Sequence, residues 1–288
     1  MAVYKKKTSI KKMFVLNGRE VLGKSISKRV ITSSFLGLLA IFAILHKEVC
    51  WLAVSLFTFI ALYEFFYMVE KKGVRLFKPF GLTIGVLIPI TVYFRFPVKE
   101  WVQFSFVILG LFILFLLELT KKETHQPILS ISATVFGIIY ISWCCSFLIR
   151  IRQLPEGAIL LGFLLLVTKS SDIGAYLWGK KFGKTLFLER VSPKKSLEGA
   201  IGGLFTSVGA GLVFSVFVTS IRFLEKFLLI LILAGISQLG DLFESLLKRD
   251  CQVKDSGKLL PGMGGVLDVI DSVIFTAPTF YLYLTMMR

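Results

Sequence analysis

Two pairs of carboxylates flank a charged loop near the end of the chain. Asp241 and Glu244 lie three residues apart before this loop, and Asp268 and Asp271 lie three residues apart after it. Residues at this spacing share one face of a helix, so each pair would point in a common direction. Carboxylate oxygens are the ligands that hard cations such as Mg²⁺ prefer. The spacing predicts that two helix ends bring four carboxylates to one metal.

The loop between these pairs supplies groups that suit a polyphosphate. Lys248, Arg249 and Lys254 carry positive charge, and the glycine-rich sequence Pro261–Gly265 lets a ligand approach the backbone closely. Together with the carboxylates, this loop predicts a site for a metal and a polyphosphate.

Ion pairs within the chain are the competing interpretation of these charges. Glu244 and Lys248 are four residues apart, so they can neutralise each other on one helix. Lys169 and Asp172, in an earlier apolar segment, can form such a pair or line a polar cavity, because a charge at membrane depth costs about 2.5 to 3.5 kcal/mol. Asp241 has no basic residue within one helical turn, so a cation or a lysine from elsewhere must compensate it.

A third polar segment begins at Ser192. Ser192 or Ser196 is suited to cap the helix that follows, and free amides at a helix start beside Lys194 and Lys195 would bind an anion. Gly199 suits close helix packing as well as the approach of a ligand.

Taken in chain order, these three segments resemble the signature of the phosphatidate cytidylyltransferases, the CDP-diacylglycerol synthases. The resemblance covers about residues 165–272. In the last segment the matching positions are Ser245, Lys248, Arg249, Lys254, Asp255, Gly257, Pro261, Gly264, Gly265, Asp268 and Asp271. The family usually has His where this chain has Met263 and Arg where it has Val269, so no role is carried over to those two positions.

The resemblance implies transfer of a cytidylyl group from CTP to phosphatidate, which gives CDP-diacylglycerol and pyrophosphate for phospholipid biosynthesis. It implies metal-assisted in-line attack of the lipid phosphate on the α-phosphorus of CTP, with Mg²⁺ as cofactor and a second cation left open. The expected metal ligands are Asp241 and Asp268, with Glu244 and Asp271 beside them. The expected catalytic residues are Asp241, Asp268, Lys248, Arg249 and Lys254. The expected substrate-binding residues are Lys169, Asp172, Ser192, Lys194, Lys195, Gly199, Gly264 and Gly265.

The composition is that of an integral membrane protein. Of 288 residues, 55% are hydrophobic and 28 are Phe, which is far from the composition of a soluble domain. Apolar runs recur that approach the roughly 20 residues needed to cross a bilayer core. We expect an all-α polytopic fold with about nine transmembrane helices, at residues 31–46, 49–69, 79–94, 101–119, 127–149, 157–178, 199–220, 227–247 and 265–287.

Three regions follow from this division of the chain. We expect a basic arm at the bilayer surface over residues 1–30 and a transmembrane scaffold of about five helices over residues 31–155. The catalytic region, over residues 156–288, would contain about four helices with cytoplasmic motif loops.

Charge sets the expected orientation, because Lys and Arg accumulate in cytoplasmic loops. With nine crossings and a cytoplasmic N-terminus, most of the 34 Lys and Arg residues fall on the cytoplasmic side. This predicts a multi-pass protein of the inner cell membrane with its active site facing the cytoplasm. The net charge of +16 is spread over short loops, so nucleic acid is not expected as a partner. The expected partners are CTP, phosphatidate and the bilayer, and a homodimer is left open.

Other classes of chemistry have weaker support. The four cysteines lack CxxC spacing and are expected to be free thiols, and two histidines are too few to favour a histidine-ligated zinc site or a Ser-His-Asp triad. Two alternatives stay open: a CTP-dependent polyprenol or phytol kinase, and a lipid or ion transporter. Glu64, in an aromatic-rich apolar run, also has two open interpretations, pairing with another helix or lining a polar cavity.

Overall fold

The fold is given by a computed structural model that describes residues 29–95, 100–121, 126–188 and 190–286, with the backbone alone for 100–106. The basic arm expected over residues 1–30 lies outside this part of the chain, apart from Arg29 and Val30, which begin a helix. Within the described residues the regular elements are helices, and the β pairing there consists of two isolated bridges.

The helices follow one another with mostly short connections. The first runs over Arg29–Leu45. The others are α2 (Lys47–Lys71), α3 (Lys78–Tyr93), α4 (Glu100–Leu119), α5 (Pro127–Gly137), the π-helical turn η1 (Ile138–Trp143), α6 (Cys144–Arg152), α7 (Gly157–Phe182), α8 (Leu197–Phe214), the short 3-10 helix η2 (Ser215–Phe217), α9 (Phe223–Asp250) and α10 (Leu267–Met286).

Each of the predicted membrane crossings falls on one of these helical stretches. By length and composition, six stretches are able to cross a bilayer: Lys47–Lys71, Pro127–Arg152, Gly157–Phe182, Leu197–Phe217, Phe223–Asp250 and Leu267–Met286. The shorter apolar helices Arg29–Leu45, Lys78–Tyr93 and Val107–Leu119 match the remaining predictions. The expected all-α, polytopic membrane fold is therefore confirmed.

Local sequence explains where several helices begin. Pro79 stands in the first turn of α3 and Pro127 opens α5, where the N–H that proline lacks would have no helical partner. Ser196 is extended and caps α8, because its hydroxyl accepts a hydrogen bond of 3.1 Å from the Gly199 N–H. Of the two serines suited to this role, Ser196 is the cap.

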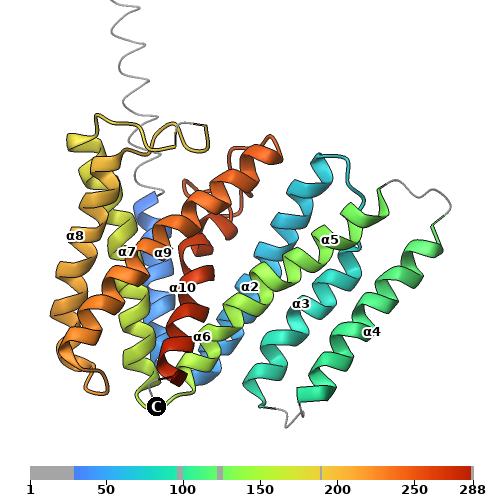
Figure 1. Ribbon diagram of the computed structural model, residues 1–288, viewed down its shortest axis with the longest axis horizontal. Coiled ribbons are helices and arrows are strands. Elements are labelled where there is room, and N and C mark those ends of the chain that lie inside the picture. Colours follow the sequence, from blue (N-terminus) through green and yellow to red (C-terminus); the bar gives the residue numbers. More distant parts are fainter. Residues whose placement is uncertain (1–28, 96–99, 122–125, 189, 287–288) are drawn as a thin grey trace, which may run out of the picture.

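Two groups of helices meet at the centre of the molecule (Figure 1). α7, α8 and α9 lie at one end, α3, α4 and α5 lie at the other, and α2 and α10 run between them. α10 packs on α9 and α7, and it also packs on α6 and α2. The last helix therefore contacts both the region expected to be the scaffold and the region expected to be catalytic.

Glycines let α7 and α8 approach closely. A Cβ added at Gly199 would lie 2.8 Å from the Ala175 carbonyl oxygen, and one added at Gly203 would lie 2.8 Å from the Ser171 carbonyl oxygen. The packing interpretation of Gly199 is therefore supported. Glu198, at the start of α8, accepts hydrogen bonds of 3.1 Å from backbone N–H groups just after α7. The loop between the two helices is thereby fixed at their shared end.

The crossing Pro127–Arg152 contains the π-helical turn η1. Such turns commonly occur near functional sites. Here the turn includes Tyr140, whose ring lies 5.3 Å from that of Phe136, 5.4 Å from that of Phe243 and 5.5 Å from that of Phe275. This aromatic cluster joins the N-terminal helices to α9 and α10.

The first helix is held at both of its ends. At its C-terminal end, Arg152 of α6 donates hydrogen bonds of 2.6 Å to the Ile44 carbonyl and 2.8 Å to the Leu45 carbonyl. A cation there also opposes the negative end of the helix dipole. At the other end, the Arg29 side chain donates a hydrogen bond of 2.5 Å to the carbonyl of Gly262. The helix thus connects the end of α6 to the glycine-rich turn before α10.

Candidate functional site

The first turn of α10 carries one polar cluster. Asp268 accepts hydrogen bonds of 2.8 Å from the Gly265 N–H and 2.9 Å from both the N–H and the hydroxyl of Ser256. Its other carboxylate oxygen lies 2.6 Å from Lys248 Nζ in α9. Lys248 also forms an ion pair with Glu244, one helical turn earlier. The loop between α9 and α10 is thus folded back onto the start of α10.

The turn before α10 depends on glycine. Gly262 and Gly264 have φ values of 81° and 98°, in the region that favours glycine. A Cβ added at Gly264 would also lie 2.5 Å from Asp268 Oδ2. The close backbone approach expected at this turn is therefore made by the protein's own carboxylate.

A second polar cluster joins α7 to α9 and α10. Lys169 Nζ donates hydrogen bonds to Asp172 Oδ2 at 3.1 Å, to Ser272 Oγ at 2.8 Å and to the Val269 carbonyl at 2.8 Å. Asp172 accepts further hydrogen bonds from the hydroxyl of Ser272 at 2.9 Å and from that of Ser237 at 3.3 Å. The ion pair expected as one interpretation of Lys169 and Asp172 is present, and it links three helices.

The loop before α8 lies against α9. Lys195 Nζ is 2.6 Å from Asp241 Oδ2, so a lysine from outside α9 compensates this carboxylate. Arg249, about two turns further along α9, donates a hydrogen bond of 3.4 Å to the carbonyl of Val191 in the same loop. The segments around residues 192 and 241, distant in sequence, therefore meet at one end of the bundle.

Two of the predicted metal ligands are deeply buried. Glu244 is fully buried, and within the described residues neither of its carboxylate oxygens has a hydrogen bond in addition to the ion pair with Lys248. Asp271 is 6% exposed and accepts a hydrogen bond of 2.5 Å from the N–H of Ser272. It lies within electrostatic range of Asp241 and of the α7 ion pair. Carboxylates here outnumber the lysines that pair with them, and such an excess of buried negative charge fits a cation.

The four predicted metal ligands are nevertheless divided among separate contacts. Asp268 and Glu244 both pair with Lys248, whereas Asp241 pairs with a different lysine and Asp271 lies deeper. No group of three His, Cys, Asp or Glu side chains in the described part of the chain is arranged to hold a metal. Metal ligation by these residues therefore stays a prediction.

The remaining predicted residues lie at the edge of this region. Lys194 and Lys254 are exposed, which leaves them accessible to a ligand. Ser192 is half-buried, and its carbonyl accepts a hydrogen bond of 3.2 Å from the Lys195 N–H. It shapes the loop that carries the lysines.

Glu64 of α2 also belongs to this region, although the sequence assigns it no role. It is 5% exposed and accepts hydrogen bonds from the N–H of Val266 at 3.1 Å, the N–H of Leu267 at 2.9 Å and the hydroxyl of Ser256 at 3.2 Å. These partners are 192 to 203 positions away in sequence. The available signal was a lone carboxylate in an apolar run, and of its two interpretations the contact with another helix is confirmed.

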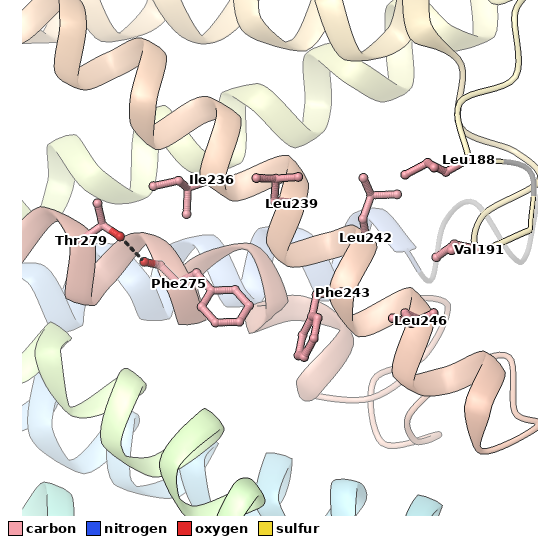
Figure 2. Close-up of a pocket in the computed structure, with 9 residues that line it drawn as sticks. All are labelled: Leu188, Val191, Ile236, Leu239, Leu242, Phe243, Leu246, Phe275 and Thr279. Carbon is pink, nitrogen blue, oxygen red and sulfur yellow. Dashed lines mark hydrogen bonds between the residues drawn. The ribbon is translucent and has the colours of Figure 1, made fainter.

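An apolar groove of about 500 Å³ runs beside these polar clusters, between α9 and α10 (Figure 2). Its lining residues are Ile236, Leu239, Leu242, Phe243 and Leu246 of α9, Phe275 and Thr279 of α10, and Leu188 and Val191 of the loop before α8. The Thr279 hydroxyl donates to the Phe275 carbonyl at 2.9 Å, so its proton is already used within α10. Arg249 follows Leu246 by three residues and lies near the loop end of the groove.

Comparison with known proteins agrees with this arrangement. The family described as the cytidylyltransferase family matches residues 27–287. The phosphatidate cytidylyltransferase of Synechocystis sp. is 33% identical over 264 residues, which cover 82% of this chain and 88% of the relative. That of Bacillus subtilis is 31% identical over 229 residues, which cover 79% of this chain and 85% of the relative.

A further relative is similar over a shorter stretch. The Escherichia coli (strain K12) protein called "Uncharacterized protein YnbB" is 45% identical over 152 residues, and the chain spans half of that relative's length. Since the family match covers nearly the whole chain, and since the fold is that of a multi-pass membrane protein, this chain belongs to the cytidylyltransferase family and is a membrane-bound nucleotidyltransferase.

Proposed function

We propose that this protein is a phosphatidate cytidylyltransferase, which converts CTP and phosphatidate into CDP-diacylglycerol and pyrophosphate. The observation that carries the proposal is the convergence of three polar segments on one end of the bundle. They contribute the Lys169–Asp172 pair, the Lys195–Asp241 pair, and Lys248 with Asp268. The phosphatidate cytidylyltransferases of Synechocystis sp. and Bacillus subtilis are similar over most of this chain, which supports the same acceptor.

The reaction requires little acid–base chemistry from the protein. A bond forms between a phosphate oxygen of phosphatidate and the α-phosphorus of CTP, and the bond from that phosphorus to the departing pyrophosphate oxygen breaks. A phosphate monoester is already ionised near neutral pH, so no side chain has to remove a proton. The protein must instead neutralise phosphate charge and align the two substrates. Lys195, Arg249 and the exposed Lys254 are suited to this task, because they lie together at the loop end of α9.

A divalent cation fits the carboxylates of this region. We assign Asp241 and Asp268 as its ligands, with Glu244 and Asp271 next to them, and leave a second cation open. The fully buried Glu244, whose oxygens have Lys248 as their ion-pair partner, supports a nearby cation. When bound, Mg²⁺ would neutralise charge on the triphosphate and favour in-line attack. Because Lys248 pairs with one oxygen of Asp268, a cation at that oxygen would compete with this lysine.

The groove along α9 suits an acyl chain of the lipid substrate. Its lining is apolar, it lies on a helix that crosses the bilayer, and Arg249 lies near its loop end. An acyl chain in the groove would leave the lipid phosphate at the basic end of α9. The substrate would then enter sideways from the leaflet, without leaving the membrane.

We place the motif loops on the cytoplasmic face of the inner membrane. The excess of Lys and Arg on one side of the predicted crossings supports this orientation. CTP would then reach the site from the cytoplasm, and phosphatidate would reach it from the inner leaflet.

The position of the label in the product tests this function and separates it from a lipid kinase. Purified protein in liposomes that contain phosphatidate is given CTP labelled either at the α-phosphate or at the γ-phosphate. A cytidylyltransferase moves the α label into the lipid and releases the γ label as pyrophosphate. A CTP-dependent kinase acting on polyprenol or phytol would move the γ label into its lipid. Absence of α label from the lipid would contradict the proposal.

A further inference from the structure

Glu64 is a buried charge that the proposed reaction leaves without a task. It lies in α2, which is otherwise a membrane crossing, and burying a carboxylate there is costly unless partners compensate it. The partners that the described residues give it are two backbone N–H groups and the Ser256 hydroxyl, all of them neutral. Its cost must therefore be offset by what it holds in place.

The contacts of Glu64 place it at the start of α10. The N–H groups of Val266 and Leu267 are the first donors of that helix, and they have no acceptor within it. A carboxylate at this position satisfies both donors and opposes the positive end of the helix dipole. Glu64 thus acts as a cap that comes from a different membrane crossing.

Two glycines of the loop make room for this carboxylate. A Cβ added at Gly257 or at Gly265 would collide with the carboxylate of Glu64. Both φ values lie outside the left-handed region, so the need for glycine here comes from space and not from backbone conformation. The loop therefore closes around Glu64 on two sides.

Ser256 links Glu64 to the candidate site. Its hydroxyl oxygen lies 3.2 Å from Glu64 Oε2 and 2.9 Å from Asp268 Oδ2. A hydroxyl has one proton to donate, so the two carboxylates share a single donor. Any shift of Glu64 would therefore be transmitted to Asp268 and to its ion pair with Lys248.

We propose that Glu64 is a positioning residue for cytidylyl transfer. From α2 it holds residues 256–267 closed on the start of α10 and thereby fixes the orientation of Asp268 and Lys248. The catalytic consequence rests on the proposed function, whereas the effect on the loop does not. A residue outside the three motif segments thus controls their geometry.

Hydrogen exchange of the full-length protein in detergent tests the effect on the loop. Glu64→Gln places an amide against two N–H donors and removes the charge. Amides of residues 256–267 should then exchange at least about tenfold faster, in line with loss of a charge-assisted hydrogen bond. Glu118→Gln is the matched control, because Glu118 is also 5% exposed but pairs with Lys121 outside this loop. Unchanged exchange in Glu64→Gln, or equal acceleration in Glu118→Gln, would overturn the proposal.

Kinetics test the catalytic consequence. In Glu64→Gln, kcat should fall at least about tenfold while KM for CTP changes less than about threefold, because the reacting groups move and the nucleotide contacts remain. Adding Ser256→Ala should cost little more, since both changes break one network. Additive losses, or a loss only in KM, would contradict a positioning role.

Two outcomes keep the proposal separate from folding and from the function itself. If Glu64→Gln does not fold, Glu64→Asp retains the charge on a shorter side chain and should still accelerate exchange of residues 256–267. Normal exchange in that variant would overturn the proposal. If the wild-type protein shows no transfer to phosphatidate, the proposed function fails, and the exchange result still decides the role of Glu64.

Discussion

Lys248 carries the largest electrostatic load of any single side chain in the candidate site. It pairs with Glu244, which is fully buried, and with Asp268, whose side chain is 9% exposed. Removing one partner of a buried ion pair leaves an uncompensated charge, which costs more than the pair itself contributes.

Lys248→Met should therefore destabilise the protein strongly. We expect a loss of about 3 to 5 kcal/mol, because two carboxylates lose their shared cation. Thermal unfolding in detergent measures this change. Lys254→Met is the control, since Lys254 is exposed and its replacement should stay within about 0.5 kcal/mol. Equal stability of the two variants would show that Glu244 and Asp268 do not depend on Lys248.

Binding of a divalent cation can be measured without turnover. Mn²⁺, as a probe of the proposed Mg²⁺ site, should bind to the purified protein and be detected by its paramagnetic resonance signal. Asp241→Asn and Asp268→Asn should each weaken binding at least about tenfold, because each removes one carboxylate ligand. Chelation should abolish transfer. Full activity under chelation, or unchanged Mn²⁺ binding in both variants, would rule out this metal site.

Some of these residue-level contacts follow from sequence and others do not. The charge of Asp241 required a partner from outside its helix, and Lys195 is that partner. The pair of Glu244 and Lys248 follows from helical spacing. The capping role of Glu64 could not be predicted, because its acceptor sites lie about two thirds of the chain away and no local pattern marks them. Sequence therefore identifies the charges but not all of their partners.

At the level of elements, α8 provides a matched pair of glycines. A Cβ at Gly199 would lie 2.8 Å from a backbone oxygen of α7, whereas a Cβ at Gly209 meets nothing within 4 Å. Both residues lie within the same helix, so helix propensity affects them similarly.

Gly199→Ala and Gly209→Ala should consequently change stability in opposite directions. Gly209→Ala should stabilise by about 0.5 to 1 kcal/mol through backbone entropy. Gly199→Ala should destabilise by about 1 to 3 kcal/mol, because a backbone carbonyl cannot give way as a flexible side chain does. Thermal unfolding in detergent distinguishes the two. A stabilised Gly199→Ala would mean that α7 and α8 separate without cost.

The positions of the helices were predictable because hydropathy determines them. Each predicted crossing matches a helical stretch, and Ser196 was one of two expected caps. The π-helical turn η1 was not predicted, since one extra residue in a helix leaves no periodic signal and its position depends on packing around Tyr140. Tertiary contacts decide such local departures.

At the scale of the whole molecule, the proposed orientation can be tested by labelling. On a background without Cys50, Cys144, Cys145 and Cys251, single cysteines at Lys184 and Lys254 should react with a membrane-impermeant reagent only in inside-out vesicles. Glu156→Cys, in the turn before α7, should react only in right-side-out vesicles. The reverse pattern would invert the proposed topology.

One native thiol gives a further check on the same preparation. Burial raises the pKa of Cys251, so less of it is thiolate near neutral pH than of an ordinary cysteine. Its alkylation should be slow at pH 7 and should accelerate above the usual thiol range. Fast labelling at pH 7 would show that the end of α9 opens in the membrane.

The proposed division at residues 155 and 156 does not separate two independent structures. Glu64 of α2 contacts the start of α10, and Arg29 contacts Gly262. The expected scaffold therefore shapes the loop that carries the motif, and a fragment containing residues 156–288 alone would lack these contacts.

The first helix has a consequence for the lipid that surrounds the protein. Its 17 residues give a length of about 25 Å, somewhat less than the roughly 30 Å of an average hydrocarbon core. Arg152 ties one end and the turn before α10 ties the other. In a thicker bilayer the helix would have to tilt or the membrane would have to thin around it. We expect turnover to decline as acyl length increases, so that the thickness of the membrane would regulate the synthesis of its own lipids.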